Sequence, residues 1–217
     1  MADPRLPLAH GERRQIVESG YDALAPRWTA WAERVVGDPA PRFLTGAVRS
    51  LRPGARVVDL GCGQGGPWTE NLARRVRLTG VDFSAEQLRY AAQRITSAEF
   101  VRADFVEVDF EPGSIELVTA FYSLTHLGQL ELAPMLRRVA RWLAPGGRLL
   151  ASLAVESGEW EGEWLGTQMF FGGWDREANV RFLDEAGLTV RFEELVAIRE
   201  PEGPVTFLWV IAEKAHG

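Results

Sequence analysis

The segment "VVDLGCGQGG" (57–66) places four glycines directly after a run of strand-forming residues. Glycine loses more backbone freedom on folding than any other residue, and a structural turn needs only one or two. The excess indicates that the backbone here lies close to another group, which we expect to be a ligand. In open α/β sheets such a loop, at the carboxyl end of a strand, is a common ligand site.

Short apolar segments alternate with amphipathic patterns from this loop onward. Strands are predicted at 56–60, 77–82, 99–104, 115–121 and 148–155, each buried on both faces. Helices, with apolar residues at spacings of three and four, are predicted at 68–75, 85–94 and 130–143. Strand–helix alternation of this kind is typical of βαβ units, so the fold class is α/β, with a parallel sheet covered on both faces.

Both ends of the chain depart from this alternation. Residues 12–51 contain no convincing strand and predict two or three helices, interrupted at Pro26, Pro39 and Pro41. We expect residues 1–51 to form a helical cap within the same domain as the core. The last two apolar segments, joined by "REPEGP", predict an antiparallel C-terminal hairpin.

Composition argues against several kinds of partner. The 24 basic and 30 acidic side chains give a net charge of −6, so no basic excess is available to neutralise nucleic-acid phosphates. Cys62 is the only cysteine, which excludes an intrachain disulfide and fits a reducing cytoplasm. The N-terminal residues lack the apolar core of a signal peptide, and no run approaches the roughly 20 apolar residues of a membrane span. We therefore expect a cytoplasmic monomer or homodimer that binds neither nucleic acid nor membrane.

The glycine loop fits two patterns. "GCGQGG" matches the dinucleotide fingerprint G-x-G-x-x-G, which is weak evidence by itself and leaves a NAD(P)-dependent oxidoreductase as one alternative. The longer pattern D-x-G-x-G-x-G, formed by Asp59, Gly61, Gly63 and Gly65, resembles the first motif of class I S-adenosylmethionine-dependent methyltransferases.

Further motifs extend this resemblance over about residues 52–214. Asp82 in "GVDFS" stands where the family binds the ribose hydroxyls, and "RADF" supplies Asp104 and Phe105 at the family's place for adenine. "AFYSLTHL" and "LAPGGRLL" correspond to the fourth and fifth strands, and the C-terminal hairpin to the sixth and seventh. The resemblance implies a Rossmann-like, doubly wound, seven-stranded and mostly parallel sheet at 52–217. It also implies S-adenosylmethionine as the cofactor.

The cofactor site is expected at the carboxyl ends of the first four strands. The residues predicted there are Asp59, Gly61, Cys62, Gly63, Gly65, Asp82, Phe83, Ser84, Asp104, Phe105 and Phe121. Two alternatives stay open, because Asp82 together with Ser84 is also placed to cap the next helix, and Asp109 competes with Asp104. Cys62 is expected to be a small apolar filler and not a nucleophile.

The segment "YDALAPRWTAW" (21–31) carries aromatic residues that suit either of two roles. It is an amphipathic helix that packs on the sheet, or it folds over the cofactor, as a similar Tyr-Asp segment does in many small-molecule methyltransferases. In the second case Tyr21 and Trp28 cover the sulfonium, because an aromatic face attracts a cation.

His126 follows the fourth strand, beside the place where the acceptor is expected. It is a candidate general base, and the alternative is a histidine that hydrogen-bonds to backbone and packs on the next helix. No acidic cluster surrounds it, so we expect no metal.

The stretch 156–174 lies between the fifth strand and the next helix and combines five large aromatics with five glycines. Its aromatics either close the core against the N-terminal helices or line the acceptor cavity as a lid that the glycines allow to open. The residues predicted to bind the acceptor are Tyr122, His126, Trp160, Trp164, Met169, Phe170, Phe171 and Trp174. Four glutamates in its first half favour a neutral or cationic acceptor with an apolar body.

The expected activity is in-line transfer of the S-adenosylmethionine methyl group to oxygen, nitrogen or carbon of a small molecule. Alignment of the reactants with water excluded is the main contribution expected of the enzyme. The alternative is a protein that binds the cofactor but catalyses a rearrangement or cyclisation.

Overall fold

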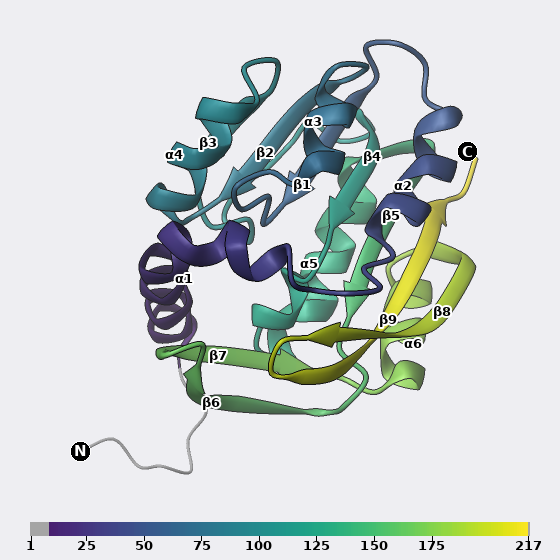
Figure 1. Ribbon diagram of the computed structural model, residues 1–217. Coiled ribbons are helices and arrows are strands. Elements are labelled where there is room, and N and C mark those ends of the chain that lie inside the picture. The colour runs from purple at the N-terminus through teal and green to yellow at the C-terminus, as the bar shows by residue number, and fades with distance from the viewer. Residues whose placement is uncertain (1–8, 217) are drawn as a thin grey trace.

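The computed structural model describes residues 9–216, so the residues that bear on a signal peptide lie outside the described part. Its main sheet has seven strands in the order β3-β2-β1-β4-β5-β9-β8 (Figure 1). The strands are β1 Arg56–Leu60, β2 Arg77–Asp82, β3 Glu99–Arg102, β4 Ile115–Ala120, β5 Leu143–Leu153, β8 Leu188–Glu200 and β9 Gly203–Lys214. Strands β1 to β5 are parallel, and β9 runs antiparallel to both β5 and β8. The predicted seven-stranded, mostly parallel sheet with a C-terminal hairpin is confirmed.

Helices cover both faces of this sheet. They are α1 His10–Ala32, α2 Ala40–Arg49, α3 Pro67–Ala73, α4 Ala85–Arg94, α5 Gln129–Trp142 and α6 Arg176–Glu185, with a short 3₁₀ helix, η1, at Leu124–His126. Side chains of α5 and α6 share a core with one face, and those of α2 and α3 share a core with the other. Within the described residues, no helix is long and apolar enough to cross a membrane.

The central strands alternate their side chains between the two cores. In β4, Leu117 packs on the α2 side and Val118 on the α5 side, and in β5, Leu150 and Leu149 do the same. Strands buried on both faces have near-continuous apolar sequences, which is why the sequence pattern located them. Strand β3 is different: the prediction of burial on both faces was wrong, because β3 is an edge strand with half-exposed residues.

The expected break at Pro26 does not occur, since this proline lies inside the 23-residue helix α1. A proline removes one backbone hydrogen bond of a helix. Packing outweighs that loss, because Val17, Leu24 and Ala25 are buried and α1 lies along strand β7. Pro39 and Pro41, in contrast, stand at the start of α2, where the helix lacks backbone partners in any case.

The stretch between β5 and α6 forms a second, two-stranded sheet, made of β6 (Gly158–Trp164) and β7 (Thr167–Gly173). Leu165 and Gly166 connect the two strands with φ of 52° and 76°, as a tight hairpin turn requires. A Cβ on Gly172 would lie 2.1 Å from the Leu127 carbonyl oxygen, and one on Gly173 would lie 2.4 Å from Ala154 Cβ. These two glycines therefore allow close packing of the hairpin, and they are not evidence that it opens.

Candidate active site

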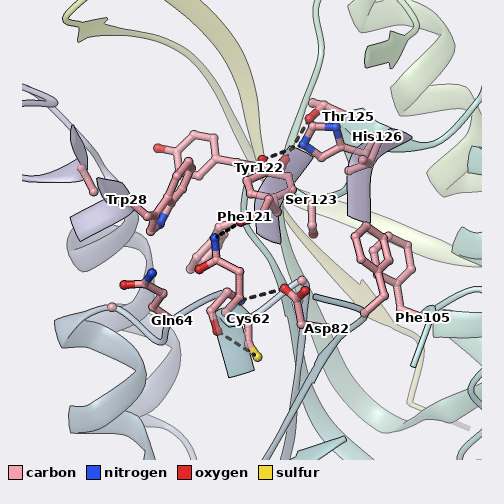
Figure 2. A pocket seen from close by; sticks show the side chains of 18 of the residues that line it. Trp28, Cys62, Gln64, Asp82, Phe105, Phe121, Tyr122, Ser123, Thr125 and His126 are labelled. Atoms are coloured by element: carbon pink, nitrogen blue, oxygen red, sulfur yellow. Dashed lines mark hydrogen bonds between the residues drawn. The ribbon is translucent and has the colours of Figure 1, made fainter. Parts of the chain in front are cut away.

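A cavity of about 430 Å³ lies at the carboxyl ends of β1, β2 and β4 (Figure 2). The chain leaves β1 toward β2 on one side, whereas β4 pairs with β1 on the other, so this is the point where strand order reverses. Helix α1, the β6–β7 hairpin, β8, β9 and the segments that follow β3 and β4 also contribute lining residues. The cavity thus joins the glycine loop to the N-terminal cap.

The three glycines of the loop have different physical reasons to be glycine. Gly61, Gly63 and Gly65 all have positive φ, at 69°, 53° and 64°. A Cβ on Gly61 would meet Ser123 Cβ at 2.3 Å, and one on Gly65 would meet Ile95 Cδ1 at 2.6 Å, so both positions serve packing. At Gly63 the nearest atom is 4.0 Å away, and the residue lines the cavity. Gly63 is therefore the glycine that leaves room for a ligand.

Asp82 connects this loop to the start of α4. Its Oδ2 accepts a hydrogen bond from Gly63 N at 2.9 Å, and its Oδ1 accepts one from Ser84 N at 2.9 Å. Ser84 itself caps α4, because its hydroxyl accepts from Gln87 N. Burial raises the pKa of Asp82 to about 6. Two backbone donors leave each carboxylate oxygen with a further lone pair that can accept from a ligand hydroxyl.

Asp59 and Cys62 differ in their access to the cavity. Asp59 is buried, accepts from Thr119 Oγ1 at 2.7 Å and is absent from the cavity lining, and burial raises its pKa to about 7. Cys62 lines the cavity, and burial raises the pKa of its thiol. The thiol is therefore protonated at neutral pH, in keeping with the expectation of a filler residue.

Asp104 and Phe105 line the end of the cavity that lies beside the first turns of α1. The Asp104 carboxylate lies 3.1 Å from His10 Nε2 and 3.8 Å from Arg14 Nε. Burial raises the pKa of Asp104, and the nearby His10 and Arg14 oppose that shift. Its competitor Asp109 is exposed and accepts from the Trp142 indole, and it does not line the cavity.

Tyr21 and His126 form a half-buried, hydrogen-bonded pair in this cavity. The Phe170 carbonyl oxygen lies 2.7 Å from His126 Nδ1, and because a carbonyl only accepts, Nδ1 carries the proton. Nε2 is then the acceptor for the Tyr21 hydroxyl, at 2.8 Å. Burial lowers the pKa of His126 to about 4, so the imidazole is neutral at pH 7.

Five aromatic rings form a continuous cluster in the cavity lining. Ring centroids are 5.4 Å apart for Tyr21–Trp28, 5.0 Å for Trp28–Trp31, 5.5 Å for Trp31–Trp164 and 5.6 Å for Trp164–Phe171. Three of these rings come from α1 and two from the hairpin. Trp31 belongs to the aromatic pattern in the sequence but was missed as a site residue.

Four residues predicted at the acceptor lie away from the cavity. Met169 and Phe170 are buried against Val17 of α1, where they anchor the hairpin. Trp160 is 48% exposed. Trp174 packs edge-on against a phenylalanine of α6 and donates to a backbone carbonyl of α5. The hairpin needs these contacts because it is not part of the main sheet. The other predicted residues Phe83, Phe121, Tyr122 and His126 do line the cavity.

Asp38 and Glu200 are two of the acidic lining residues that were not predicted, because they lie in a linker and at a strand end without any motif. Asp38 accepts from the Tyr122 hydroxyl at 2.8 Å. Glu200 ends β8, and burial raises its pKa to about 7, with a smaller contribution from nearby Glu202. An antiparallel bridge between Val36 and Arg199 brings the two segments together. Tertiary pairing alone therefore makes this end of the cavity acidic.

The lining fits S-adenosylmethionine. Gly63 leaves open space, Asp82 offers lone pairs for vicinal hydroxyls, and aromatic faces are available for a sulfonium. Gln87 Oε1 is buried and has no hydrogen-bond partner among residues 9–216, so it is a further acceptor beside the loop. Across the same residues, no three His, Cys, Asp or Glu side chains group as a metal site would require.

Comparisons with known proteins agree with this site. Residues 57–147 match the family described as a methyltransferase domain. The chain is 43% identical over 103 residues to the trans-aconitate 2-methyltransferase of Paracidovorax citrulli, a match that covers 46% of this chain and 38% of that protein. The chain spans less than half the length of these curated relatives.

Two solved structures share the fold over almost the whole chain. The 1,6-didemethyltoxoflavin-N1-methyltransferase of Burkholderia thailandensis aligns with a TM-score of 0.71 at 22% identity, covering 99% of this chain and 93% of that one. The [4+2]-cyclase SpnF aligns with a TM-score of 0.70 at 17% identity, covering 94% and 97%. The fold and the glycine loop are those of a class I S-adenosylmethionine-dependent methyltransferase. The segment that matches the methyltransferase family, residues 57–147, contains the glycine loop, Asp82 and Asp104.

Proposed function

We propose that this protein transfers the methyl group of S-adenosylmethionine to a small-molecule acceptor. The observation that carries the proposal is one cavity with the methyltransferase loop and Asp82 on one side and an aromatic cluster on the other. When bound, S-adenosylmethionine supplies an electrophilic methyl group on a sulfonium, whose sulfur keeps the electron pair of the broken C–S bond. The matched methyltransferases favour this activity over the nicotinamide alternative.

For the cofactor, Asp82 is the proposed acceptor for both ribose hydroxyls, and Asp104 and Phe105 are the proposed adenine contacts. Gly63 and Cys62 border the same space with their backbone. Asp59 joins the end of β1, just before the loop, to β4 through the Thr119 hydroxyl. These roles agree with the resemblance in the sequence and with the position of each residue in the fold.

Tyr21 and Trp28 are proposed to cover the sulfonium. Asp22 supports that position, because its carboxylate accepts from the Ser84 hydroxyl at 2.5 Å and from Glu86 N at 3.2 Å. These bonds fasten α1 to the first turn of α4 next to Asp82. The Tyr-Asp pair thus combines an aromatic face for the cofactor with an anchor for the helix that carries it.

His126 is proposed to position Tyr21. The sequence suggested a general base, but His126 Nε2 already accepts from Tyr21, and the burial that lowers its pKa to about 4 makes it a weak base. Alignment and exclusion of water remain the main contributions of the chain to the reaction.

The acceptor is proposed to lie between α1 and the hairpin, against Trp164, Phe171 and Tyr122. Such a lining suits a molecule with an apolar body that is neutral or cationic. Because Met169 and Phe170 anchor the hairpin to α1, we propose a docked wall in place of a freely opening lid.

A binding and turnover experiment tests the proposal. The protein is titrated calorimetrically with S-adenosylhomocysteine and, separately, with NADH, and is then incubated with methyl-labelled S-adenosylmethionine and a metabolite extract. We expect S-adenosylhomocysteine to bind, NADH not to bind, and label to appear in a metabolite as S-adenosylhomocysteine accumulates. Binding without any transfer of label would favour the rearrangement or cyclisation alternative, and binding of NADH alone would refute the proposal.

A further inference from the structure

We propose that the acceptor is an amine, that the Glu200 carboxylate binds its ammonium group, and that Glu200 takes the proton which the amine must lose before methylation. This inference rests on the proposed function and deepens it, because it names the substrate class and the proton acceptor. It concerns the wall of the cavity formed by residues 28–38 and 198–207.

Glu200 is the half-buried carboxylate of this wall that is available to a ligand, whereas Glu33 of the same wall is exposed to solvent. It lines the cavity and has no hydrogen-bond or ion-pair partner among residues 9–216. Asp38 and Glu202 are engaged, since Asp38 accepts from Tyr122 and Ala40 N, and Glu202 accepts from the Trp31 indole. Burial is the main cause of the raised pKa of the Tyr21 and Tyr122 hydroxyls, and the charge of Glu200 adds a smaller contribution to both, which places it within electrostatic reach of both.

The charge of the wall suits a cation. Segments 28–38 and 198–207 contribute three acidic residues to the lining, Glu33, Asp38 and Glu200, and no lysine or arginine. The arginines of the lining come instead from the first turns of α1 and the end of α4. Arg13 and Arg14, in the first turns of α1, pair with the carboxylates of Glu131 and Asp104 at the other end of the cavity. A carboxylate beside aromatic faces is a favourable site for an ammonium group.

The aromatic rings complete the site. Trp28 and Trp31 of α1 and Trp164 of the hairpin line the cavity as one packed cluster, with ring centroids 5.0–6.2 Å apart. Their faces supply apolar area for the body of the acceptor and attraction for its charge. An anionic acceptor would instead meet uncompensated repulsion from Glu200, and a neutral one would leave the carboxylate without a partner.

The proton transfer is chemically balanced. An ammonium nitrogen has no lone pair, so one N–H bond breaks and an O–H bond forms on Glu200, which leaves a neutral amine with a free lone pair and a neutral carboxyl. The proton then passes from Glu200 to solvent. Burial raises the pKa of Glu200 to about 7, close to the pH at which a base has to work, whereas His126 Nε2 is occupied by Tyr21.

A charge series with one apolar body tests the inference without turnover. Tryptamine, tryptophol and indole-3-acetate are titrated calorimetrically into protein saturated with S-adenosylhomocysteine. We expect tryptamine to bind about 10-fold more tightly than tryptophol, with indole-3-acetate the weakest, as loss of one charge-assisted hydrogen bond predicts. Glu200→Gln should abolish this preference, and the matched control Glu202→Gln should retain it.

The outcomes separate the two proposals. Failure of the wild-type protein to bind S-adenosylhomocysteine refutes the proposed function itself. Normal S-adenosylhomocysteine binding without a preference for tryptamine, including the case in which none of the three indoles binds, overturns the amine inference alone. A preference that persists in Glu200→Gln, with S-adenosylhomocysteine affinity unchanged, overturns the role of Glu200.

Discussion

Asp82 carries two tasks with one carboxylate, since it holds the glycine loop through Gly63 and the start of α4 through Ser84. Asp82→Ala should weaken S-adenosylhomocysteine by about 1.5–3 kcal/mol, the usual contribution of hydrogen bonds to a charged group. It should also lower the melting temperature, because two backbone amides lose their acceptor. Asp82→Asn is the control, because its amide oxygen can still accept one of the two backbone hydrogen bonds and we expect the variant to keep the fold. Unchanged affinity of Asp82→Ala in calorimetry would mean that the ribose assignment is wrong.

His126 and Tyr21 should behave as one unit. His126→Ala leaves the Tyr21 hydroxyl and the Phe170 carbonyl without their partner, so we expect a loss of about 1–3 kcal/mol in the free energy of unfolding. Once an acceptor is identified, Tyr21→Phe and His126→Ala should slow methylation by similar factors, and the double variant should add little. The opposite outcome would favour His126 as a general base: His126→Ala loses about 10²–10⁴-fold in rate but keeps its stability, and Tyr21→Phe keeps its activity.

At the scale of elements, Gly20 determines how closely the hairpin approaches α1. A Cβ at this position would lie 2.8 Å from Met169 Cε and 2.9 Å from the Gln168 carbonyl oxygen. The methionine end can move, but the carbonyl is backbone, so β7 has to shift. The close contact between α1 and β7 therefore depends on the absence of a side chain at Gly20.

Gly20→Ala should loosen the hairpin. We expect protease Glu-C to cleave β6 of the ligand-free variant about 5-fold faster, which corresponds to about 1 kcal/mol in the opening equilibrium. Gly11→Ala adds the same methyl group to the same helix, where nothing lies within 4 Å, and should leave cleavage unchanged. Equal cleavage of both variants would contradict a hairpin docked on α1. Rapid cleavage of the wild-type protein that S-adenosylhomocysteine and an acceptor suppress would favour the mobile lid.

At the scale of the whole molecule, the buried carboxylates make stability depend on pH. Asp59 has a pKa of about 7 in the folded protein, above its ordinary value of 3.8, so the folded state binds this proton more tightly than the unfolded state does. The resulting stabilisation is complete below pH 3.8 and is lost as the pH rises to about 7. His126 acts in the opposite sense, because its pKa is lowered from 6.5 to about 4.

Comparison with Asp59→Asn isolates the Asp59 contribution. The variant keeps an oxygen for the Thr119 hydroxyl and removes the ionisable group. The quantity to compare is the free energy of unfolding of Asp59→Asn minus that of the wild type, measured by urea unfolding of the ligand-free protein. We expect this difference to be roughly 2–3 kcal/mol more favourable to the variant at pH 8 than at pH 5. The contribution of His126 cancels in this difference, and that of Asp82 cancels in part, because the charge of Asp82 helps to raise the pKa of Asp59. The same gain at both pH values would mean that Asp59 titrates normally.

The parallel sheet could be predicted because its central strands are buried on both faces and therefore carry apolar runs, as in 56–60 and 115–120. The β6–β7 hairpin was missed. Glu alternates with Trp or Gly over residues 159–164, which is a strand-like period, but the five glycines of 156–174 obscured it, and packing of Met169 and Phe170 on α1 holds the hairpin in place. The same packing explains why Pro26 does not end α1.

The cofactor end of the site was determined by the sequence alone. Asp59, the glycine loop and Asp82 lie close together along the chain, at the ends of neighbouring strands, so local spacing is enough to assemble them. Only the tertiary structure decided the acceptor end. There, α1, the hairpin and Glu200 are far apart in sequence, and the Val36–Arg199 bridge and the docking of β7 bring them together. Contacts of this kind depend on long-range packing, which leaves no periodic signal in the residues that form it.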